Sequence, residues 1–427
     1  FAEKGSNAWF EMDAADILPK GFACPHCGKS AGFTKEEDTL DGWFDSGSTH
    51  FAAMKKDQGF WPATMYLEGL DQYRGWFQSS LLTAVGAFGE GAPFKECVTH
   101  GWTVDGEGRA MHKSLGNGVD PADIFNENGA DILRLWAASA DYHADVRCSK
   151  AIFQQLSQNY LKFRNTCKFM LDNLVDFDPA HFTKAEDMPV LDRWLITKLN
   201  ELIEKVEQSY NDYEFHIITH AVNDFCVTTL SSFYLDIVKD RLYCEAADSA
   251  ERRSAQTALY LTLSTLAKLF APILAFTCDE IWLAMPHTAE DDARNVVLND
   301  MNKPFTTYAL DAETMARWEH IIEVRTAVNG ALEEARAAKV IGKSLEADVH
   351  LTVPEGDVFL ADENPAALAD LFIVSKVELA VGGELAVKVG NAAGTKCPRC
   401  WKHSLTPNAE GLCPRCAEVV RHLPDLL

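Results

Sequence analysis

The chain has 427 residues, of which 47% are hydrophobic and 24% charged, a balance typical of a soluble globular protein with roughly two to four domains. It has no run of about 18 apolar residues and no basic-then-apolar N-terminal signal, so we expect neither a membrane span nor secretion, and a cytoplasmic location. The formal net charge of −24, taken alone, argues against a nucleic-acid partner, because Lys and Arg drive binding to phosphates.

A pair of cysteines stands in the turn-rich segment from Phe1 to about His50. Cys24 and Cys27 have the spacing C-x2-C, which offers two of the four thiolates of a tetrahedral zinc site. His26 lies between them and cannot easily bind the same ion, and no second pair lies nearby. A zinc half-site completed by ligands upstream of the chain and a plain turn with two thiols both remain open.

Short strands and turns are predicted from residue 38 to residue 104. Asp38 to Gly47 ends in an apolar pair followed by Asp-Ser-Gly, which favours a strand entering a tight turn. Met65 to Leu67 predicts a short strand, and Glu68 to Phe77 leads from it into an apolar helix that continues through Ala87. Lys95 to Val104 predicts another strand. In an α/β sheet, such strand ends present side chains to ligands.

The segment from Asp105 to Asn117 predicts a loop suited to a polyphosphate. Its glycines allow a positive φ and a close approach of the backbone to a ligand, and donors and positive charges stand among them. A solvated turn with incidental basic residues is the alternative. Asp120 then caps a short helix, and a second helix is predicted from Ala130 to Ser139. The glycines are Gly106, Gly108 and Gly116, and the polar residues are Arg109, His112, Lys113 and Ser114.

Residues 150–287 are almost wholly helical by pattern, because apolar residues recur at three- to four-residue spacing. Pro272 is expected to kink the last of these helices, predicted from Glu251 to Met285. His216 and His220 share a helix face, but isoleucine follows the first where a zinc hydrolase needs glutamate, so we interpret both as structural.

One more helix is predicted from Glu313 to Ala338. Alternating apolar residues then predict strands over residues 345–353 and 377–389, the second around a Gly-Gly pair. This pattern indicates a small strand-bearing domain after the helices.

The strongest signal is the cysteine pattern near the C-terminus. Two C-x2-C pairs separated by twelve residues can close a tetrahedron around Zn²⁺ and leave no open position, so the predicted site is structural. So short a segment depends on metal binding for its folding energy. The four predicted ligands are Cys397, Cys400, Cys413 and Cys416.

The remaining cysteines stand singly among apolar residues. A disulfide framework is not expected in a cytoplasmic chain, so we expect these thiols in the core. They are Cys97, Cys148, Cys167, Cys226, Cys244 and Cys278.

Three stretches carry a resemblance to a known family. Val98 to Trp136, with Arg-Ala-Met-His-Lys-Ser inside it, resembles the second signature of the class I aminoacyl-tRNA synthetases. Two stretches resemble the isoleucyl branch of this family: Asp41 to Gly47 (Asp-Gly-Trp-Phe-Asp-Ser-Gly) and Tyr66 to Phe77 (Tyr-Leu-Glu-Gly-Leu-Asp-Gln-Tyr-Arg-Gly-Trp-Phe). The C-terminal cysteine pattern, with Trp401 directly after its second cysteine, resembles the same branch. The resemblance runs in register over nearly the whole chain and covers the C-terminal portion of the family.

The resemblance implies a multidomain fold with five segments. A partial α/β Rossmann-like catalytic domain is followed by an α-helical bundle, a small α+β junction domain and a zinc ribbon. The expected bounds are 1–48 for the end of a connective or insertion region, 49–149 for the C-terminal half of the catalytic domain, 150–300 for the helical anticodon-binding domain, 301–395 for the junction domain and 396–427 for the ribbon.

The resemblance also implies roles for five residues near the predicted strand ends. Glu68 would contact the aminoacyl-adenylate, with Asp71 and Gln72 nearby. Trp43 and Trp76 would line the pocket for the amino-acid side chain. Without the resemblance, a core tryptophan and a carboxylate facing a helix dipole are the simpler interpretations.

The phosphate loop departs from the family pattern. The family has Lys-Met-Ser-Lys-Ser where this chain has Ala110, Met111, His112, Lys113 and Ser114. Binding of ATP, with its Mg²⁺, would therefore depend on Lys113 and Ser114, with Arg109 or His112 in support. Lys113 would supply charge to the departing pyrophosphate.

The expected activity is ATP-dependent formation of isoleucyl-adenylate and transfer of isoleucine to tRNA(Ile). No His-x-Gly-His motif of the family's first signature occurs, and Phe1 is not a start methionine, so we expect the N-terminal half to be missing and the chain to be inactive alone. The segment that would carry editing is expected upstream. A non-catalytic tRNA-binding fragment and a valine- or leucine-specific relative are the alternatives, since one methylene is worth only about 1–3 kcal/mol.

Local basic groups keep tRNA open as a partner despite the negative net charge. They fall in three clusters: Lys162, Arg164 and Lys168; Arg252 and Arg253; and the stretch from Lys396 to Arg415.

Overall fold

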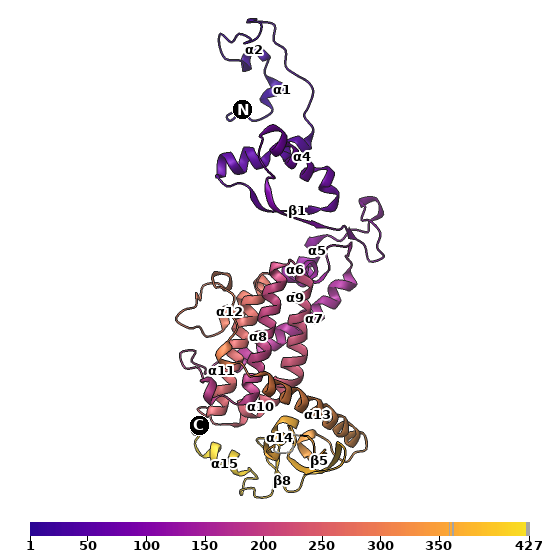
Figure 1. Cartoon of the computed structure of the whole chain (residues 1–427), viewed down its shortest axis with the longest axis vertical. Coiled ribbons are helices and arrows are strands. Elements are labelled where there is room, and N and C mark those ends of the chain that lie inside the picture. The colour runs from indigo at the N-terminus through magenta and orange to yellow at the C-terminus, as the bar shows by residue number, and fades with distance from the viewer. Residues whose placement is uncertain (358, 361–362, 424–427) are drawn as a thin grey trace. The chain divides into compact units, whose positions relative to one another are not determined.

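The computed structural model describes residues 1–357, 359–360 and 363–423. The chain divides into two units: Phe1–Trp102 with His143–Asp145, and Thr103–Tyr142 with Val146 onward (Figure 1). The last four residues of the predicted ribbon, 424–427, lie outside the described part. Among the described helices, none is long and apolar enough to cross a membrane.

The first unit is built around two parallel strands. β1 (Ala63–Gly69) pairs with β2 (Phe94–His100), so that Glu68 lies opposite Thr99 and Gly69 opposite His100 at the carboxyl ends. The helical crossover between the strands satisfies the rule that parallel neighbours need a long connection. It comprises η2 (Leu70–Arg74), α4 (Trp76–Leu82) and η3 (Thr83–Ala87), and before β1 lie α1 (Ala8–Glu11), α2 (Ala14–Ile17), α3 (Gly42–Gly47) and η1 (His50–Gln58).

The predicted strand over Asp38 to Gly47 is wrong, because its second half is the helix α3. The Asp41 side chain accepts a hydrogen bond from the backbone N–H of Trp43 at 2.7 Å and so caps the first turn. Gly47 then lets α3 approach α4 closely: a Cβ there would lie 2.4 Å from the Ser79 Cβ. Packing between the helices outweighs the strand tendency of the Trp-Phe pair.

The single strand predicted from Lys95 to Val104 is divided into two. β2 ends at His100, and β3 (Thr103–Val104) belongs to the second unit, where it pairs with β4 (Val146–Arg147). The break falls at Gly101, where a Cβ would lie 2.4 Å from the Ala144 carbonyl oxygen. A close backbone contact therefore interrupts the strand.

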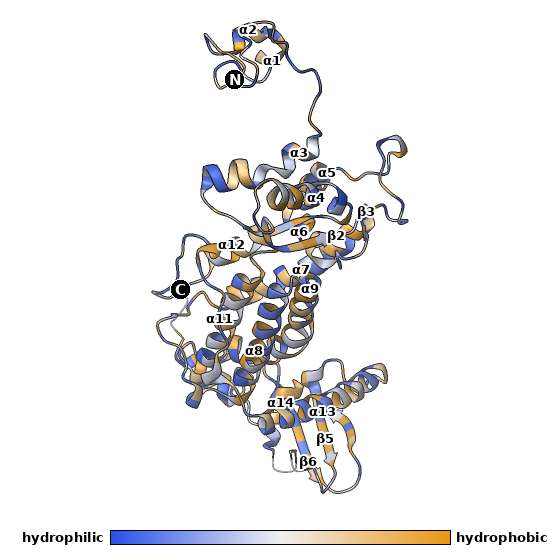
Figure 2. Ribbon diagram, turned by 45° about the horizontal axis from the view of Figure 1, so that its top comes forward, coloured by the Kyte–Doolittle hydropathy of each residue, from blue (hydrophilic) through white to orange (hydrophobic). Residues whose placement is uncertain are grey.

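The second unit begins with the loop and two short helices, and continues as a helix bundle. Asp120 caps α5 by accepting the Ala122 N–H at 2.9 Å, and α6 has the predicted bounds Ala130–Ser139. In Figure 2 the bundle helices carry both hydrophobic and hydrophilic segments, as amphipathic helices do. The helices are η4 (Lys113–Leu115), α5 (Pro121–Asn128), α6, α7 (Lys150–Asp172), η5 (Ala185–Asp187), α8 (Val190–Asn211), α9 (Phe215–Asp224), η6 (Phe225–Tyr234), α10 (Leu235–Cys244), α11 (Ala250–Phe270), α12 (Ala275–Ala284), η7 (Val296–Leu298), η8 (Thr306–Tyr308) and α13 (Ala312–Ala337).

The kink predicted at Pro272 is a full break between α11 and α12. Two residues of α6 satisfy the backbone groups that the break exposes. Asp131 accepts the Thr277 backbone N–H at 2.7 Å and its hydroxyl at 2.6 Å, and Arg134 donates to the Ile273 carbonyl at 2.9 Å. α6, the second helix after the phosphate-type loop, is thereby attached to the bundle.

A three-stranded sheet follows the bundle. β5 (Ala347–Val353) lies between β6 (Lys376–Val381), which is parallel to it, and β7 (Ala386–Asn391), which is antiparallel. The predicted alternation of β5 is confirmed, since its odd-numbered residues are buried. α13 and α14 (Pro365–Phe372) pack on this sheet, and their apolar side chains join the core of the bundle.

The C-terminal cysteine segment packs on α10. It contains β8 (Thr395–Lys396), β9 (His403–Ser404) and α15 (Pro414–Arg421). Arg399 donates to the carbonyl oxygens of Cys244 and Tyr243, and Arg415 forms ion pairs with Asp240 and Glu245. The arginine of each C-x2-C pair therefore attaches the segment to the bundle.

The expected core position of the single cysteines is confirmed for five of six. Cys148, Cys167, Cys226, Cys244 and Cys278 are buried, whereas Cys97 is exposed. It lies on β2, where four of the seven residues are exposed. A parallel strand is normally covered on both faces, so the first unit leaves open a surface that such sheets usually bury.

Candidate functional site

The sequence-predicted residues fall into one group in each unit and a cysteine group near the C-terminus. Trp43, Glu68, Asp71, Gln72 and Trp76 belong to the first unit, and Lys113 and Ser114 belong to the second.

Two tryptophans lie where α3 packs on α4. Trp43, in the first turn of α3, is 47% exposed. Trp76 begins α4, stacks on Tyr66 with ring centroids 4.2 Å apart, and donates its indole N–H to the Ser46 carbonyl at 3.1 Å. The close contact at Gly47 thus positions both indoles, one exposed and one half-buried.

Three polar residues surround the carboxyl end of β1. Glu68 is exposed, and its carboxylate accepts the Gly69 N–H at 3.3 Å. The Gln72 side-chain oxygen Oε1 accepts the Trp76 backbone N–H at 3.0 Å, and its side-chain Nε2 donates to the Asp71 carboxylate at 3.5 Å. Gln72 therefore supports the start of α4, while Glu68 and Asp71 retain acceptor capacity.

Gly75 allows the Gln72 side chain and the Trp43 indole to lie close together. A Cβ at this position would lie 2.6 Å from the Gln72 Oε1 and 3.4 Å from the Trp43 Cζ2. A side chain here would displace either the amide or the indole, so the absence of one allows their close approach.

His100 is a polar residue at this place that the sequence interpretation did not single out. It ends β2 opposite Gly69, and its Nδ1 hydrogen-bonds to the Gly101 carbonyl at 2.8 Å. A Cβ on Gly69 would lie 3.7 Å from the His100 Cε1. The sequence signal was a histidine followed by a glycine inside the strand predicted from Lys95 to Val104, and only the structure shows that the strand ends there.

The predicted phosphate-type loop is held at its base by Asp105. This carboxylate accepts hydrogen bonds from the Asn117 amide at 2.9 Å, the Arg109 backbone N–H at 2.9 Å and the Glu107 N–H at 3.0 Å. These donors, Asn117 first and the Arg109 N–H next, hold the Asp105 pKa well below its usual range. Asn117 also accepts the His112 N–H at 3.0 Å. Both ends of the loop are thus joined.

Glycine conformations close the loop, although one of the three expected positions differs. Gly108 and Gly116 have φ values of 84° and 59°, whereas Gly106 is not in the positive-φ region. Gly116 follows a short turn of 3-10 helix that begins at Lys113. The turn places Lys113 and Ser114 at the exposed tip.

The basic side chains of the loop have different surroundings. Arg109 forms ion pairs with Asp105 at 2.9 Å and with Glu107 at 3.2 Å. Lys113 and Ser114 are exposed, and neither side chain has a hydrogen-bond or ion-pair partner among the described residues. Lys113 lines a hollow of about 360 Å³ with Met111, His112 and two glycines. Between Arg109 and Lys113, only Lys113 is therefore available to an anion within the described part of the chain.

The four C-terminal cysteines converge. Their sulfur atoms all lie within 4.8 Å of one another, and the Cys400 and Cys413 sulfurs are 3.7 Å apart. Thiolates about 2.3 Å from a zinc ion at tetrahedral angles lie roughly 3.7–3.8 Å apart. Burial opposes ionisation of the Cys397 thiol, but the backbone N–H groups of Cys400, Cys413 and Arg399 outweigh it and lower its pKa to about 6. The cluster has the composition and spacing to hold a metal ion.

Cys24 and Cys27 form a turn with the same backbone pattern. The Cys24 N–H donates to the Lys29 carbonyl at 2.8 Å, and the Gly28 N–H donates to the Cys24 carbonyl at 2.9 Å. The corresponding bonds at Cys397, to Lys402 and from Trp401, are both 2.9 Å long. No third ligand joins this pair among the described residues, so whether it binds an ion stays open.

Most of the predicted basic clusters form ion pairs within the chain. Arg252 and Arg253 bind Asp176, and Lys168 binds Asp172. In the last cluster, Lys396, Lys402 and Arg415 bind Glu346, Asp370 and Asp240. By contrast, Lys162 and Arg164 of α7 are exposed and have no ion-pair partner in the described ranges.

Comparison with protein families gives two matches. The family described as "tRNA synthetases class I (I, L, M and V)" matches residues 1–149. The family described as "Anticodon-binding domain of tRNA ligase" matches residues 192–351, from α8 into β5.

Curated relatives match almost the whole chain. The chain is 47% identical to an isoleucine–tRNA ligase of Moorella thermoacetica over 99% of this chain and 47% of the relative. It is 48% identical to an isoleucine–tRNA ligase of Desulforamulus reducens, again over 99% of this chain and 47% of the relative. The chain thus spans about half the length of these relatives.

A solved structure shares the fold. A LeuRS of Agrobacterium radiobacter K84, crystallised in a ternary complex with tRNA and LeuAMS, aligns with a TM-score of 0.54 at 17% identity, over 87% of this chain and 38% of that one. Together, the two family matches and the identity to curated relatives confirm the resemblance found in the sequence. The chain belongs to the class I aminoacyl-tRNA synthetases of the isoleucine, leucine, methionine and valine group.

Proposed function

We propose that the chain is the C-terminal portion of an isoleucine–tRNA ligase, which activates isoleucine with ATP and transfers it to tRNA(Ile). The observation that carries this proposal is the identity of 46–48% to isoleucine–tRNA ligases over 98–100% of the chain. Lys113 supports it, because this lysine is exposed and has no ion-pair partner among the residues that the structure describes, and a polyphosphate needs a cation that is not already neutralised.

The reaction has two steps. The isoleucine carboxylate attacks the α-phosphorus of ATP, a new P–O bond forms, and pyrophosphate leaves with the bonding electrons. A ribose hydroxyl of the tRNA end then attacks the carbonyl carbon of the adenylate, and AMP leaves. The protein forms no covalent intermediate, so it acts by positioning and by stabilising charge.

In the first unit, Glu68 binds the aminoacyl-adenylate. Its exposed carboxylate has acceptor capacity for an ammonium or a ribose hydroxyl, and Asp71 lies close by. Trp43 and Trp76 form the apolar wall for the branched side chain. Gln72 contributes by fixing the start of α4 beneath Trp76.

In the second unit, Lys113 binds the phosphates of ATP and stabilises the departing pyrophosphate. Ser114 supplies a hydroxyl donor at the same tip, and Mg²⁺ accompanies ATP. Arg109 has a different role, because Asp105 and Glu107 neutralise it: it maintains the base of the loop.

The helix bundle, the junction domain and the C-terminal cysteine segment take part in binding tRNA. Bundle and junction form the tRNA-binding body, with Lys162 and Arg164 as phosphate contacts. Cys397, Cys400, Cys413 and Cys416 hold a structural Zn²⁺, which fits their sulfur spacing.

Isoleucine-dependent ATP–pyrophosphate exchange tests the proposal, measured on the chain extended upstream to the length of its relatives. We expect exchange with isoleucine to exceed exchange with valine by roughly 10- to 200-fold, the range that one methylene gives. Leucine and valine at equal concentration are the controls. Preference for either one would reassign the amino acid. Binding of tRNA without any exchange would instead identify a non-catalytic tRNA-binding protein.

A further inference from the structure

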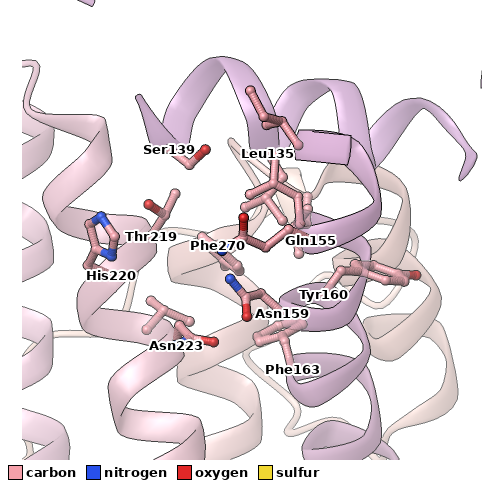
Figure 3. Close-up of a pocket in the computed structure, with 14 residues that line it drawn as sticks. Leu135, Ser139, Gln155, Asn159, Tyr160, Phe163, Thr219, His220, Asn223 and Phe270 are labelled. Carbon is pink, nitrogen blue, oxygen red and sulfur yellow. The ribbon is translucent and has the colours of Figure 1, made fainter. Parts of the chain in front are cut away.

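A cavity of about 230 Å³ lies within the second unit, between α6, α7, α9 and the end of α11. In Figure 3, Gln155 and Asn159 of α7 project toward Thr219, His220 and Asn223 of α9, with Ser139 of α6 nearby. The proposed catalytic residues and the cysteine cluster do not line it.

The amide side chains in this cavity are available for hydrogen bonding. Gln155, Asn159 and Asn223 make no side-chain hydrogen bond within the described part of the chain, although Asn159 and Asn223 are half-buried. Each primary amide offers two donors and an acceptor. Three such groups at one cavity can bind a ligand that presents donors and acceptors side by side.

The hydroxyl groups add acceptors. The Ser139 hydroxyl donates to the Trp136 carbonyl at 3.1 Å, and the Thr219 hydroxyl donates to the His216 carbonyl at 2.9 Å. Since each hydroxyl proton is already engaged, the oxygen lone pairs remain for an N–H of the ligand.

The floor of the cavity is apolar and partly aromatic. It consists of Leu135, Phe163, Phe270 and Leu274, all at most 5% exposed. The rings of Phe163 and Phe270 lie edge to face, with centroids 5.1 Å apart. Water can satisfy the amides but gains nothing from such a floor, whereas a flat ring gains burial.

Charge narrows the ligand class. The lining residues include no Lys, Arg, Asp or Glu, so neither a polyphosphate nor the two charges of a free amino acid find a partner. The volume is below the roughly 300–1,000 Å³ of drug-sized pockets. The lining therefore suits one neutral, planar ring system with several polar edge atoms.

We propose that this cavity binds a nucleobase, held by Asn159, Asn223 and Gln155 over the Phe163–Phe270 floor. Amide side chains match the donor–acceptor edges of bases, and extruded bases bind against aromatic side chains. The base can come from a free nucleoside or from an unpaired nucleotide of a bound RNA. Lys162, exposed on α7 three residues beyond Asn159, can reach a phosphate attached to such a base.

The test uses the double variant Asn159→Ala, Asn223→Ala and the matched control Asn165→Ala, an exposed residue of α7 outside the cavity. Because the two replaced amides bond to nothing in the described structure, the melting temperature should change little. Adenosine and uridine binding is measured by calorimetry on the whole chain. In the extended enzyme the double variant should retain isoleucine-dependent exchange within about twofold, which separates this proposal from the proposed function.

Two results support the proposal and distinguish the sources of the base. A free nucleoside is the source if the double variant binds it roughly tenfold or more weakly and the control binds it as the wild type does. Each lost hydrogen bond lowers the affinity by about fivefold. If no nucleoside binds, the source is tested with a tRNA transcript that contains 4-thiouridine. Photo-cross-links from this transcript to residues 155–159 or 219–223 that disappear in the double variant identify an RNA base. Absence of both signals, or signals unchanged in a folded double variant, overturns the proposal.

Discussion

The loop cations show how neighbours decide which charge can act on a ligand. Arg109 and Lys113 are four residues apart and both exposed, yet Asp105 and Glu107 neutralise Arg109 while Lys113 has no partner among described residues. The sequence predicted that Lys113 would dominate. It could not exclude Arg109, because the Asp105–Arg109 contact depends on the fold of the loop.

Replacing Lys113 by alanine in the extended enzyme should slow adenylate formation by about 10²- to 10³-fold, or about 3–4 kcal/mol, as for loss of one preorganised charge donor. Isoleucine-dependent pyrophosphate exchange measures this loss. Lys205→Ala, which removes an exposed lysine of α8 instead, is the matched control and should leave the rate unchanged. If Lys113→Ala exchanges at the wild-type rate, the loop does not bind the phosphates.

The Asp176 carboxylate should make stability depend on acid pH. Arg252 binds it through two nitrogens, at 2.6 and 2.9 Å, and Gln256 donates at 2.8 Å. The hydrogen bond from Arg252 is the main reason that the Asp176 pKa is lowered to about 2; burial opposes this shift and the hydrogen bond from Gln256 adds to it. The unfolded value is about 3.9, so the stabilisation is complete above that pH and disappears as the pH falls toward 2.

Asp176→Asn should therefore lower the free energy of unfolding at pH 7 by about 1 kcal/mol, a value discounted for the 43% exposure of the carboxylate. Urea unfolding at pH 7 and near pH 2 measures the difference, which should shrink at the lower pH. Asp172→Asn, which breaks only an exposed pair with Lys168, should change stability less. A difference between wild type and Asp176→Asn that does not vary with pH would contradict the assignment.

At the scale of elements, periodicity predicted long helices well. The helix expected from Glu313 to Ala338 is α13, Ala312–Ala337, and α6 has the expected bounds. Short segments failed where tertiary contacts decide. α3 was predicted as a strand because neither the Asp41 cap nor the packing of Gly47 on Ser79 is visible in sequence spacing.

The same limit applies to the tRNA-facing charges. Sequence spacing marked three basic clusters, yet most of their members bind carboxylates that are distant in the chain, such as Arg415 with Asp240. Such pairings become visible only when the ribbon segment is seen packed on α10. Because these ion pairs neutralise the other basic side chains, only Lys162 and Arg164 are proposed as phosphate contacts.

Zinc should be required by one element and not by the bundle. The chain should carry one zinc ion per molecule, and the double variant Cys397→Ser, Cys400→Ser should lose it, because two thiolates cannot close the tetrahedron. Hydrogen exchange should then rise over residues 396–423 while the bundle stays protected. Cys97→Ser, which replaces an exposed thiol, should retain the metal. Equal zinc in wild type and the double variant would refute the site.

At the scale of the whole molecule, the sequence predicted the family, which the comparisons confirm. β1 carries Glu68, the proposed adenylate contact, but it forms with β2 a sheet of only two strands in the described structure, and four of the seven β2 residues are exposed. A parallel pair is rarely stable uncovered. The chain spans about half the length of its curated relatives.

The most direct test of the account is ATP–pyrophosphate exchange with isoleucine on the 427-residue chain alone, compared with the same chain joined to the preceding segment. The transition state needs charge stabilisation on both sides of the α-phosphate, and this chain contributes Lys113 without a His-x-Gly-His partner. Groups that act as a unit are strongly non-additive, so half of the site should give essentially no activity. We predict no isoleucine-dependent exchange by the chain alone and ready exchange by the joined protein; robust exchange by the chain alone would contradict the account.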